Sequence, residues 1–288
     1  MTVSKPTIVF VHGAWGGSAQ WATLISILQA AGSKCVAVDL PSSGAVPAHA
    51  NFDQDVEKVR ATVLAVLDDA GEDCVVVTHS YGGMVGTQAL HGLGKATRSH
   101  AADGNGNGKA VLRLLYLTAL VFPEESSYLN YERPNSLPSE TGLEMDVVDG
   151  NATLLNAVEC FFNDLPAEEA RYWNSQLKTQ SIACLESPIK HAAWREIPAS
   201  YLFCENDAII PLVMQEKMVA EANAELQLQR ELELGGEARK SESGGERAAQ
   251  KRSRPFRTET INAAHFPQLS KPAEVAEFVQ RHVRVALE

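Results

Sequence analysis

Short runs of β-branched and other apolar residues alternate along this chain with longer stretches of helical period, and this alternation limits the possible folds most strongly. Strands that alternate with amphipathic helices are typical of a parallel sheet covered by helices on its faces. The expected strands are Thr7–Val11, Cys35–Asp39, Cys74–Thr78, Val111–Thr118, Ala199–Phe203 and Arg257–Ile261. The expected core helices are Ser18–Ala31, Asp53–Ala70, Met84–Leu90, Pro211–Ala224 and Pro272–Val285. The pattern therefore predicts an α/β fold with a mostly parallel sheet flanked by helices.

Residues 123–198 interrupt this alternation. Two stretches in this segment, Asn151–Phe162 and Pro166–Ser181, have the spacing of helices. A helical insertion between strands of a parallel sheet lies at the end of the sheet where ligands bind. We therefore expect residues 123–198 to form a helical cap, or lid, and residues 1–122 and 199–288 to form the α/β core.

Two further segments, residues 93–109 and 231–255, are rich in glycine and polar residues. Such segments cannot bury enough apolar surface to form part of a core. We interpret both as solvated insertions in the α/β core.

The composition excludes several classes of partner. The formal net charge of -11 at pH 7 would repel nucleic acid and acidic membranes, so we expect neither and predict a small-molecule substrate. The N-terminus lacks a basic segment followed by an apolar stretch, and no apolar run approaches the roughly 20 residues of a membrane span. We therefore expect a cytoplasmic protein, whose oligomeric state the sequence leaves open. The five cysteines are widely spaced without a CxxC pair, which predicts neither a disulfide framework nor a metal site.

The strongest chemical signal is T-H-S-Y-G-G at residues 78–83, directly after an apolar strand. A serine at such a strand-to-helix turn has its hydroxyl exposed above the sheet. Glycines at 82 and 83 would let the helix begin close to the neighbouring strand. The usual pattern is G-x-S-x-G, and Thr78 departs from it at the first position. The motif indicates a nucleophile at Ser80, and the alternative is an ordinary helix N-cap.

A second glycine-rich loop follows the first strand as H-G-A-W-G-G at residues 12–17. Its glycines permit close approach to the nucleophile, so its backbone amides can help to form an oxyanion hole. We predict the amides of Ala14 and Tyr81 as the two donors. Neither GxGxxG nor GxxxxGK[ST] is present, so a phosphate-binding loop is not indicated.

An acid and a base follow in the order that a Ser-Asp-His triad of this kind requires. Asp207 comes just after the strand Ala199–Phe203, and Glu205 is the alternative acid. His265 lies between the last strand and the last helix. A carboxylate in this position holds an imidazole in the required tautomer. His12 and His79 lie beside the predicted reacting groups, and we interpret them as supporting residues.

With these segments in place the chain resembles the α/β-hydrolase superfamily over most of its length, outside the two polar insertions. Within it the chain is similar to the plant methylesterase and hydroxynitrile lyase branch and its fungal relatives. The resemblance rests on His12-Gly13-Ala14-Trp15, His79-Ser80-Tyr81-Gly82-Gly83, Asn206-Asp207 with Ile210-Pro211, and His265-Phe266-Pro267. It implies the α/β-hydrolase fold, the triad and the oxyanion donors named above, without a metal or organic cofactor.

The expected reaction is hydrolysis of a small ester, lactone or thioester through an acyl-enzyme. Lyase or other acyl-transfer chemistry on the same triad is the first alternative, and a small-molecule receptor is the second. The resemblance implies that the lyases of this branch carry Thr at the position of Gly13 and Lys at the position of Phe266. This chain has neither, which favours the hydrolase.

Aromatic residues indicate an apolar or aromatic substrate, although each of them is individually more typical of a core position. The candidates at the lid and pocket mouth are Trp15, Tyr81, Phe122, Tyr128, Phe161, Phe162, Trp173 and Trp194. We select as substrate-pocket candidates Trp15, Phe122, Tyr128 and Trp173, together with Phe266.

Overall fold

The computed structural model describes residues 5–98, 108–131, 142–240 and 254–288. Six strands in these ranges form one sheet, in which every neighbouring pair is parallel and the order is β2-β1-β3-β4-β8-β9. The strands are β1 Thr7–Val11, β2 Cys35–Val38, β3 Cys74–His79, β4 Val111–Leu117, β8 Ala199–Cys204 and β9 Arg257–Ile261. The expected strands and the predicted parallel sheet are thereby confirmed, with differences of one residue at four strand ends.

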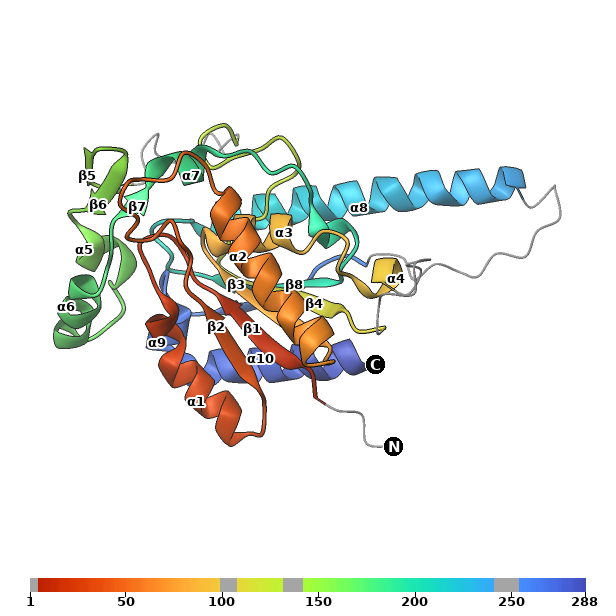
Figure 1. Ribbon diagram of the computed structural model, residues 1–288, viewed down its shortest axis with the longest axis horizontal. Coiled ribbons are helices and arrows are strands. Elements are labelled where there is room, and N and C mark those ends of the chain that lie inside the picture. Colours follow the sequence, from red (N-terminus) through yellow and green to blue (C-terminus); the bar gives the residue numbers. More distant parts are fainter. Residues whose placement is uncertain (1–4, 99–107, 132–141, 241–253) are drawn as a thin grey trace.

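Helices cover both faces of the sheet (Figure 1). They are η1 Ser18–Trp21, α1 Ala22–Ala30, α2 Asp53–Leu64, η2 Ala65–Asp69, α3 Gly82–Ala89, α4 Lys95–Arg98, α8 Leu212–Lys240, α9 Pro267–Ser270 and α10 Pro272–Leu287. Within every described range, each helix is too short or too polar to cross a lipid bilayer.

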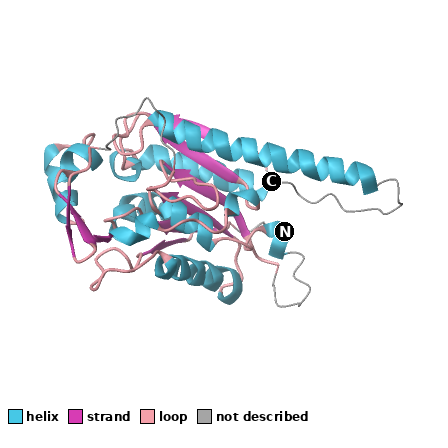
Figure 2. Cartoon of the chain, turned by 90° about the horizontal axis from the view of Figure 1, so that it is seen from above, coloured by secondary structure: helices cyan, strands magenta, loops and turns pink. Residues whose placement is uncertain are grey.

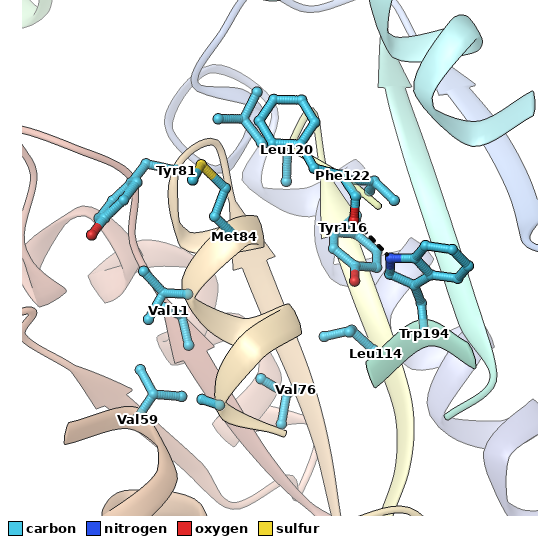
Figure 3. Packing of buried hydrophobic residues seen from close by; sticks show 14 of the residues in the cluster. Val11, Val59, Val76, Tyr81, Met84, Leu114, Tyr116, Leu120, Phe122 and Trp194 are labelled. Carbon is cyan, nitrogen blue, oxygen red and sulfur yellow. Dashed lines mark hydrogen bonds between the residues drawn. The ribbon is translucent and has the colours of Figure 1, made fainter. Parts of the chain in front are cut away.

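Successive residues of each central strand pack on opposite faces of the sheet. In β1, Ile8 and Phe10 belong to a buried cluster with side chains of α1 and α10. Val9 and Val11 belong to a second cluster, which contains side chains of α2, α3 and α8. Figure 3 shows part of this second cluster, where Met84 of α3 lies above the strands. Burial of both faces explains why the central strands are apolar at nearly every position.

The segment between β4 and β8 departs from the expected helical cap. Its elements are β5 Met145–Val148, β6 Asn151–Leu154, α5 Ala157–Phe161, α6 Ala167–Ser175, β7 Gln180–Ser181, α7 Ile182–Glu186 and η3 Ala193–Arg195. Strands β5, β6 and β7 form a small antiparallel sheet. The prediction of one helix over Asn151–Phe162 is therefore wrong in its first part, and the helix predicted over Pro166–Ser181 ends at Ser175.

A two-residue turn explains the error. Asp149 and Gly150 connect β5 to β6 with positive φ values of 50° and 78°. An Asp-Gly pair with positive φ at both positions forms the tight turn that best matches the twist of a hairpin. The local turn chemistry thus overrides the helical spacing of the apolar residues that follow.

Helix α8 is longer than expected, because it continues past Ala224 to Lys240. The residues after 224 are mostly Glu, Leu, Gln and Arg, which are strong helix formers. The predicted insertion at 231–255 therefore begins as helix, and its residues 241–253 lie outside the described residues. In Figures 1 and 2 the second half of α8 extends beyond the other helices and strands. The other insertion, 93–109, begins with α4, and its residues 99–107 also lie outside the described residues.

Candidate active site

Three predicted site residues meet at the carboxyl edge of the sheet. Ser80 follows β3, Asp207 lies three residues after the end of β8, and His265 lies four residues after the end of β9. Because the strands are parallel, the loops after them lie on the same side of the sheet. Side chains that are up to 185 positions apart in the chain are thereby brought into contact.

The backbone at Ser80 has φ of +52°, in the left-handed region that side chains rarely occupy. The turn is held by close packing of the helix that follows. A Cβ at Gly82 would lie 2.5 Å from the carbonyl oxygen of His12, and a Cβ at Gly83 would lie 2.5 Å from that of Leu120. Both glycines are therefore required for α3 to begin this close to the strands, as the sequence motif indicates.

Thr78, which replaces the usual first glycine of the motif, is accommodated by a glycine elsewhere. Its hydroxyl donates to the carbonyl of Leu115 at 3.2 Å, and its methyl group lies against Gly86 of α3. A Cβ at Gly86 would lie only 2.6 Å from that methyl carbon. The larger residue in the strand is thus compensated by a missing side chain in the facing helix.

A hydrogen-bonded chain joins Ser80, His265 and Asp207. Nε2 of His265 lies 3.0 Å from Oγ of Ser80, and Nδ1 of His265 lies 2.7 Å from Oδ2 of Asp207. With the proton on Nδ1, the ring donates to the carboxylate and accepts from the serine hydroxyl. The His265 and Asp207 side chains are buried, whereas Ser80 is partly exposed. Ser80 is therefore the member that a ligand can reach.

The carboxylate of Asp207 is held by further donors. The backbone amides of Ile209 and Ile210 donate to Oδ1 at 2.7 and 2.9 Å, and the Thr118 hydroxyl donates to Oδ2. These bonds fix the carboxylate in the orientation that His265 requires. Glu205, the alternative acid, is exposed and has no side-chain bond to His265 within the described part of the chain.

His12 and His79 lie beside the site, and neither forms a hydrogen bond with Ser80 in the described residues. Nε2 of His79 donates to the backbone carbonyl of His265 at 2.6 Å. Nε2 of His12 accepts from the Leu40 amide at 3.0 Å, and its Nδ1 donates to the Gly13 carbonyl at 2.7 Å. His79 thus connects the segment of Ser80 to the loop of His265, and His12 connects the loops that follow β1 and β2.

Burial of these two histidines makes the free energy of unfolding depend on pH. Burial, together with the nearby His265, holds the pKa of His79 well below its ordinary value of 6.5, and burial also lowers the pKa of His12. Below about pH 6.5 the unfolded chain therefore binds more protons at these positions than the folded chain does. We expect the free energy of unfolding to fall as the pH is lowered from about 7.5 to about 5.5.

Urea denaturation at the two pH values measures this effect. His79→Gln removes one titrating group but keeps an amide that can donate to the His265 carbonyl, so its stability should depend less on pH than that of the wild type. Equal pH dependence in both proteins would show that His79 does not cause the effect.

The glycine-rich loop after β1 lies against the nucleophile. A Cβ at Gly13 would lie 2.8 Å from Cβ of Ser80. Within the described residues, neither the Ala14 amide nor the Tyr81 amide donates a hydrogen bond to the protein. Trp15, the next residue of the loop, has φ of +59° and is almost fully buried. The predicted oxyanion donors are thus on the two segments that flank Ser80.

The predicted pocket residues divide into two groups. Trp15 and Phe266 lie at the site, since Phe161 connects them with ring-centroid distances of 6.0 and 5.3 Å. Phe161, which comes from α5, also lies 5.2 Å from the His265 ring. The sequence indicated Phe161 only as one of several aromatic residues at the lid, and the structure places it next to the reacting groups. The Phe162 ring also packs against Phe266, at a centroid distance of 5.0 Å.

The contacts of the other three pocket candidates are with other partners. The Phe122 ring stacks on Tyr131, and the Trp173 ring packs on Tyr172. Tyr128 lies partly buried against the main core cluster.

A second serine–histidine–carboxylate chain runs from Ser200 and His282, which are buried, to Glu259, which is partly exposed. The Ser200 hydroxyl is 3.0 Å from Nδ1 of His282, and Nε2 of His282 is 3.1 Å from Glu259. Ser200 is completely buried in β8, and Arg113 also donates to its hydroxyl. This cluster has the residue types of a triad, but a substrate has no access to its serine.

The comparisons with known proteins agree with this fold. Residues 8–278 match the model of the Alpha/beta hydrolase family. The chain is 32% identical to the Aspergillus novofumigatus "Alpha/beta hydrolase nvfD" over 222 residues, which cover 76% of this chain and 85% of the relative. It is 37% identical to the "Probable esterase PIR7A" of Oryza sativa subsp. indica over 78 residues, 26% of this chain and 30% of the relative. The solved structure of polyneuridine aldehyde esterase is similar, with a TM-score of 0.67, 19% identity and coverage of 97% and 99% of the two chains.

Proposed function

The chain belongs to the alpha/beta hydrolase family and is an ester hydrolase of that fold, and on this premise we propose that it cleaves a small ester-like substrate through an acyl-enzyme on Ser80. The observation that carries the proposal is the hydrogen-bonded chain from Ser80 through His265 to Asp207, built on a serine with positive φ. Strained backbone at a partly exposed serine is typical of a nucleophile.

In the proposed first step, Oγ of Ser80 attacks the acyl carbon while Nε2 of His265 takes the hydroxyl proton. The imidazolium that forms is stabilised by the ionised Asp207, whose carboxylate is already held by three other donors. His265 then gives its proton to the leaving alcohol, and the acyl group remains on Ser80. Water, deprotonated by His265, attacks the acyl-enzyme, and His265 then returns this proton to Oγ of Ser80 as the acid is released. No metal or organic cofactor takes part in this scheme.

The proposed oxyanion hole consists of the backbone amides of Ala14 and Tyr81. Support comes from their positions on both sides of Ser80 and from the absence of another hydrogen-bond acceptor for them among the described residues. Preorganised amides stabilise the charge that develops on the carbonyl oxygen, and the loss of one such donor costs about 10²- to 10³-fold in kcat.

The proposed substrate is apolar or aromatic, and we place its pocket beside Trp15, Phe161 and Phe266. Phe161 comes from the segment that we expect to form the cap, residues 123–198. Further contacts support a cap at this position, because the indole of Trp15 donates to the Ala152 carbonyl at 2.9 Å and the Ala264 amide donates to Asp164 at 2.8 Å.

Two features favour hydrolysis over a cyanide-releasing lyase reaction. A threonine at position 13 would bring its Cβ within 2.8 Å of Cβ of Ser80. The ring of Phe266 is buried against His79 and Phe162, so it supplies no cation for a departing anion. The charge that this site can stabilise is therefore that of an acyl oxyanion.

We expect the wild-type protein to hydrolyse phenyl or short-chain esters and to release no aldehyde from mandelonitrile. Product analysis in ¹⁸O-labelled water should find one labelled oxygen in the acid, because water attacks the acyl group. Aldehyde release from mandelonitrile without ester cleavage would contradict the proposal and favour the lyase.

A further inference from the structure

A buried hydrogen-bond network connects the two segments that carry the proposed oxyanion donors. It starts at the backbone of Trp15, whose N–H donates to Oε1 of Gln180 at 3.2 Å. Nε2 of Gln180 donates to Oγ of Ser42 at 2.8 Å, and Ser42 donates from both its hydroxyl and its amide to Asp55, at 2.5 and 2.8 Å. The Tyr81 hydroxyl donates to the same carboxylate at 2.6 Å.

The direction of each bond is fixed along this network. The Asp55 carboxylate accepts every bond that reaches it, so the Ser42 hydroxyl must point its proton toward Asp55 and accept from Gln180. Gln180 consequently presents its amide nitrogen to Ser42 and its oxygen to Trp15. Burial next to Asp55 raises the pKa of Tyr81 well above its ordinary value, which keeps the phenol protonated as a donor.

All five residues are buried, and side-chain groups in such surroundings are costly to leave unpaired. Only one arrangement of donors and acceptors therefore leaves every polar group of the network paired. It fixes Trp15, the residue after Ala14, and Tyr81, the residue after Ser80. Both segments have backbone in the left-handed region, with φ of +59° at Trp15 and +52° at Ser80, so they need external contacts to keep their shape.

The part of the network that holds Trp15 comes from the expected cap. Gln180 belongs to β7, and the neighbouring Lys178 donates its amide to the Trp15 carbonyl at 2.9 Å. The indole of Trp15 is bound by Ala152 of β6. One cap segment thus binds the amide, the carbonyl and the side chain of a single residue in the glycine-rich loop.

We propose that Gln180, Ser42 and Asp55 are positioning residues that set the spacing between the Ala14 and Tyr81 amides, so that the cap segment helps to build the oxyanion hole. This inference rests on the proposed function. The inference goes beyond the proposed function, because it assigns a role in catalysis to side chains that touch neither the substrate nor the triad. An error of about 1 Å in the placement of a catalytic group can cost about 10²-fold in rate.

Two substitutions remove hydrogen bonds of the network with little change in shape. Tyr81→Phe removes the phenol hydroxyl, and Gln180→Met removes both amide contacts at similar side-chain length. The matched control is Tyr116→Phe, because the Tyr116 hydroxyl is equally buried and has a 2.7 Å bond to Thr87 in the core. The wild type, these three variants and the double variant Tyr81→Phe/Gln180→Met are compared by thermal melting and by kcat and KM for p-nitrophenyl acetate. The affinity for phenylboronic acid, which forms a tetrahedral adduct on a reactive serine, is the second measurement.

We expect Tyr81→Phe and Gln180→Met each to lower kcat by about 10- to 10²-fold with KM nearly unchanged, since a displaced oxyanion donor acts mainly on the transition state. Affinity for the boronic acid should fall in parallel. In Tyr116→Phe the melting temperature should fall while kcat stays at the wild-type value. The double variant should lose less than the product of the two single losses, because both substitutions break one network.

Wild-type kcat in folded Tyr81→Phe and Gln180→Met proteins would overturn the inference and leave the proposed function standing. Equal losses of kcat in Tyr116→Phe would also overturn it, because they would reflect general destabilisation. A wild type that cleaves no ester and binds no boronic acid would overturn both the proposed function and the inference.

Discussion

Replacing Ser80 with alanine should lower kcat for ester hydrolysis by about 10⁶-fold, as expected when the nucleophile of a triad is removed. The physical reason is that no other group at the site can form the acyl-enzyme, since His265 and Asp207 are buried behind Ser80. Residual turnover should come from the oxyanion hole and from substrate binding. Initial rates with an activated phenyl ester, measured for the wild type and Ser80→Ala, test this prediction.

Ser200→Ala is the control for this measurement. Ser200 also bonds a histidine that bonds a carboxylate, but it is completely buried and its hydroxyl also receives a bond from Arg113. We expect this variant to lose stability and to keep its kcat. If Ser200→Ala lost activity while folded and Ser80→Ala kept it, the nucleophile would be misassigned.

Replacing Asp207 with asparagine should lower kcat by about 10⁴-fold. Asparagine has the shape of aspartate, but its amide cannot stabilise an imidazolium and can favour the wrong tautomer of His265. The bonds from Ile209 and Ile210 can be kept by the remaining oxygen, so the fold should change little. The prediction is tested by kcat together with the circular dichroism spectrum of the variant.

Glu205→Gln is the matched control, because Glu205 lies two positions away on the same loop and is exposed. Its kcat should remain within about twofold of the wild type, as is usual for exposed side chains outside the site. A large loss in Glu205→Gln with an active Asp207→Asn would show that the acid was wrongly chosen.

Much of the fold could be predicted from the sequence because strands and core helices have local periodic signals. The apolar run before Ser80 marks β3, and the parallel alternation then fixes where the loops after β8 and β9 must lie. Ser80, Asp207 and His265 could be selected for this reason, since each lies in a loop at the carboxyl edge. Their separation along the chain does not matter, because the parallel topology brings these loops to the same edge of the sheet.

The segment 123–198 could not be predicted as well, because its local signals are short and compete with one another. Helical spacing over 151–162 conflicts with the Asp149-Gly150 turn, and the turn determines the structure. The signal in the sequence that indicates the hairpin is the Asp-Gly pair between Val147-Val148 and Asn151. Phe161 reaches His265 only because this hairpin is followed by a short helix.

Supporting residues were missed for a different reason. Thr118 follows β4 at the same edge as Ser80, so its position could have marked it as a partner for Asp207. Gln180 and Asp55 carry no such signal, since each is one polar residue in an unremarkable stretch. Gln180 meets Ser42 across 138 positions of the chain, and only tertiary structure brings them together.

The most direct test of the account is the reaction of the wild-type protein with a fluorophosphonate, followed by intact-mass measurement and peptide mapping. We expect one adduct per chain, located on Ser80, because among the serines described here this one alone combines a histidine ring nitrogen at 3.0 Å with partial exposure. The adduct should be absent from Ser80→Ala and present in Ser200→Ala. An adduct that persists at full stoichiometry in Ser80→Ala, or a wild type that stays unlabelled while folded, would contradict the assignment of Ser80 as the nucleophile.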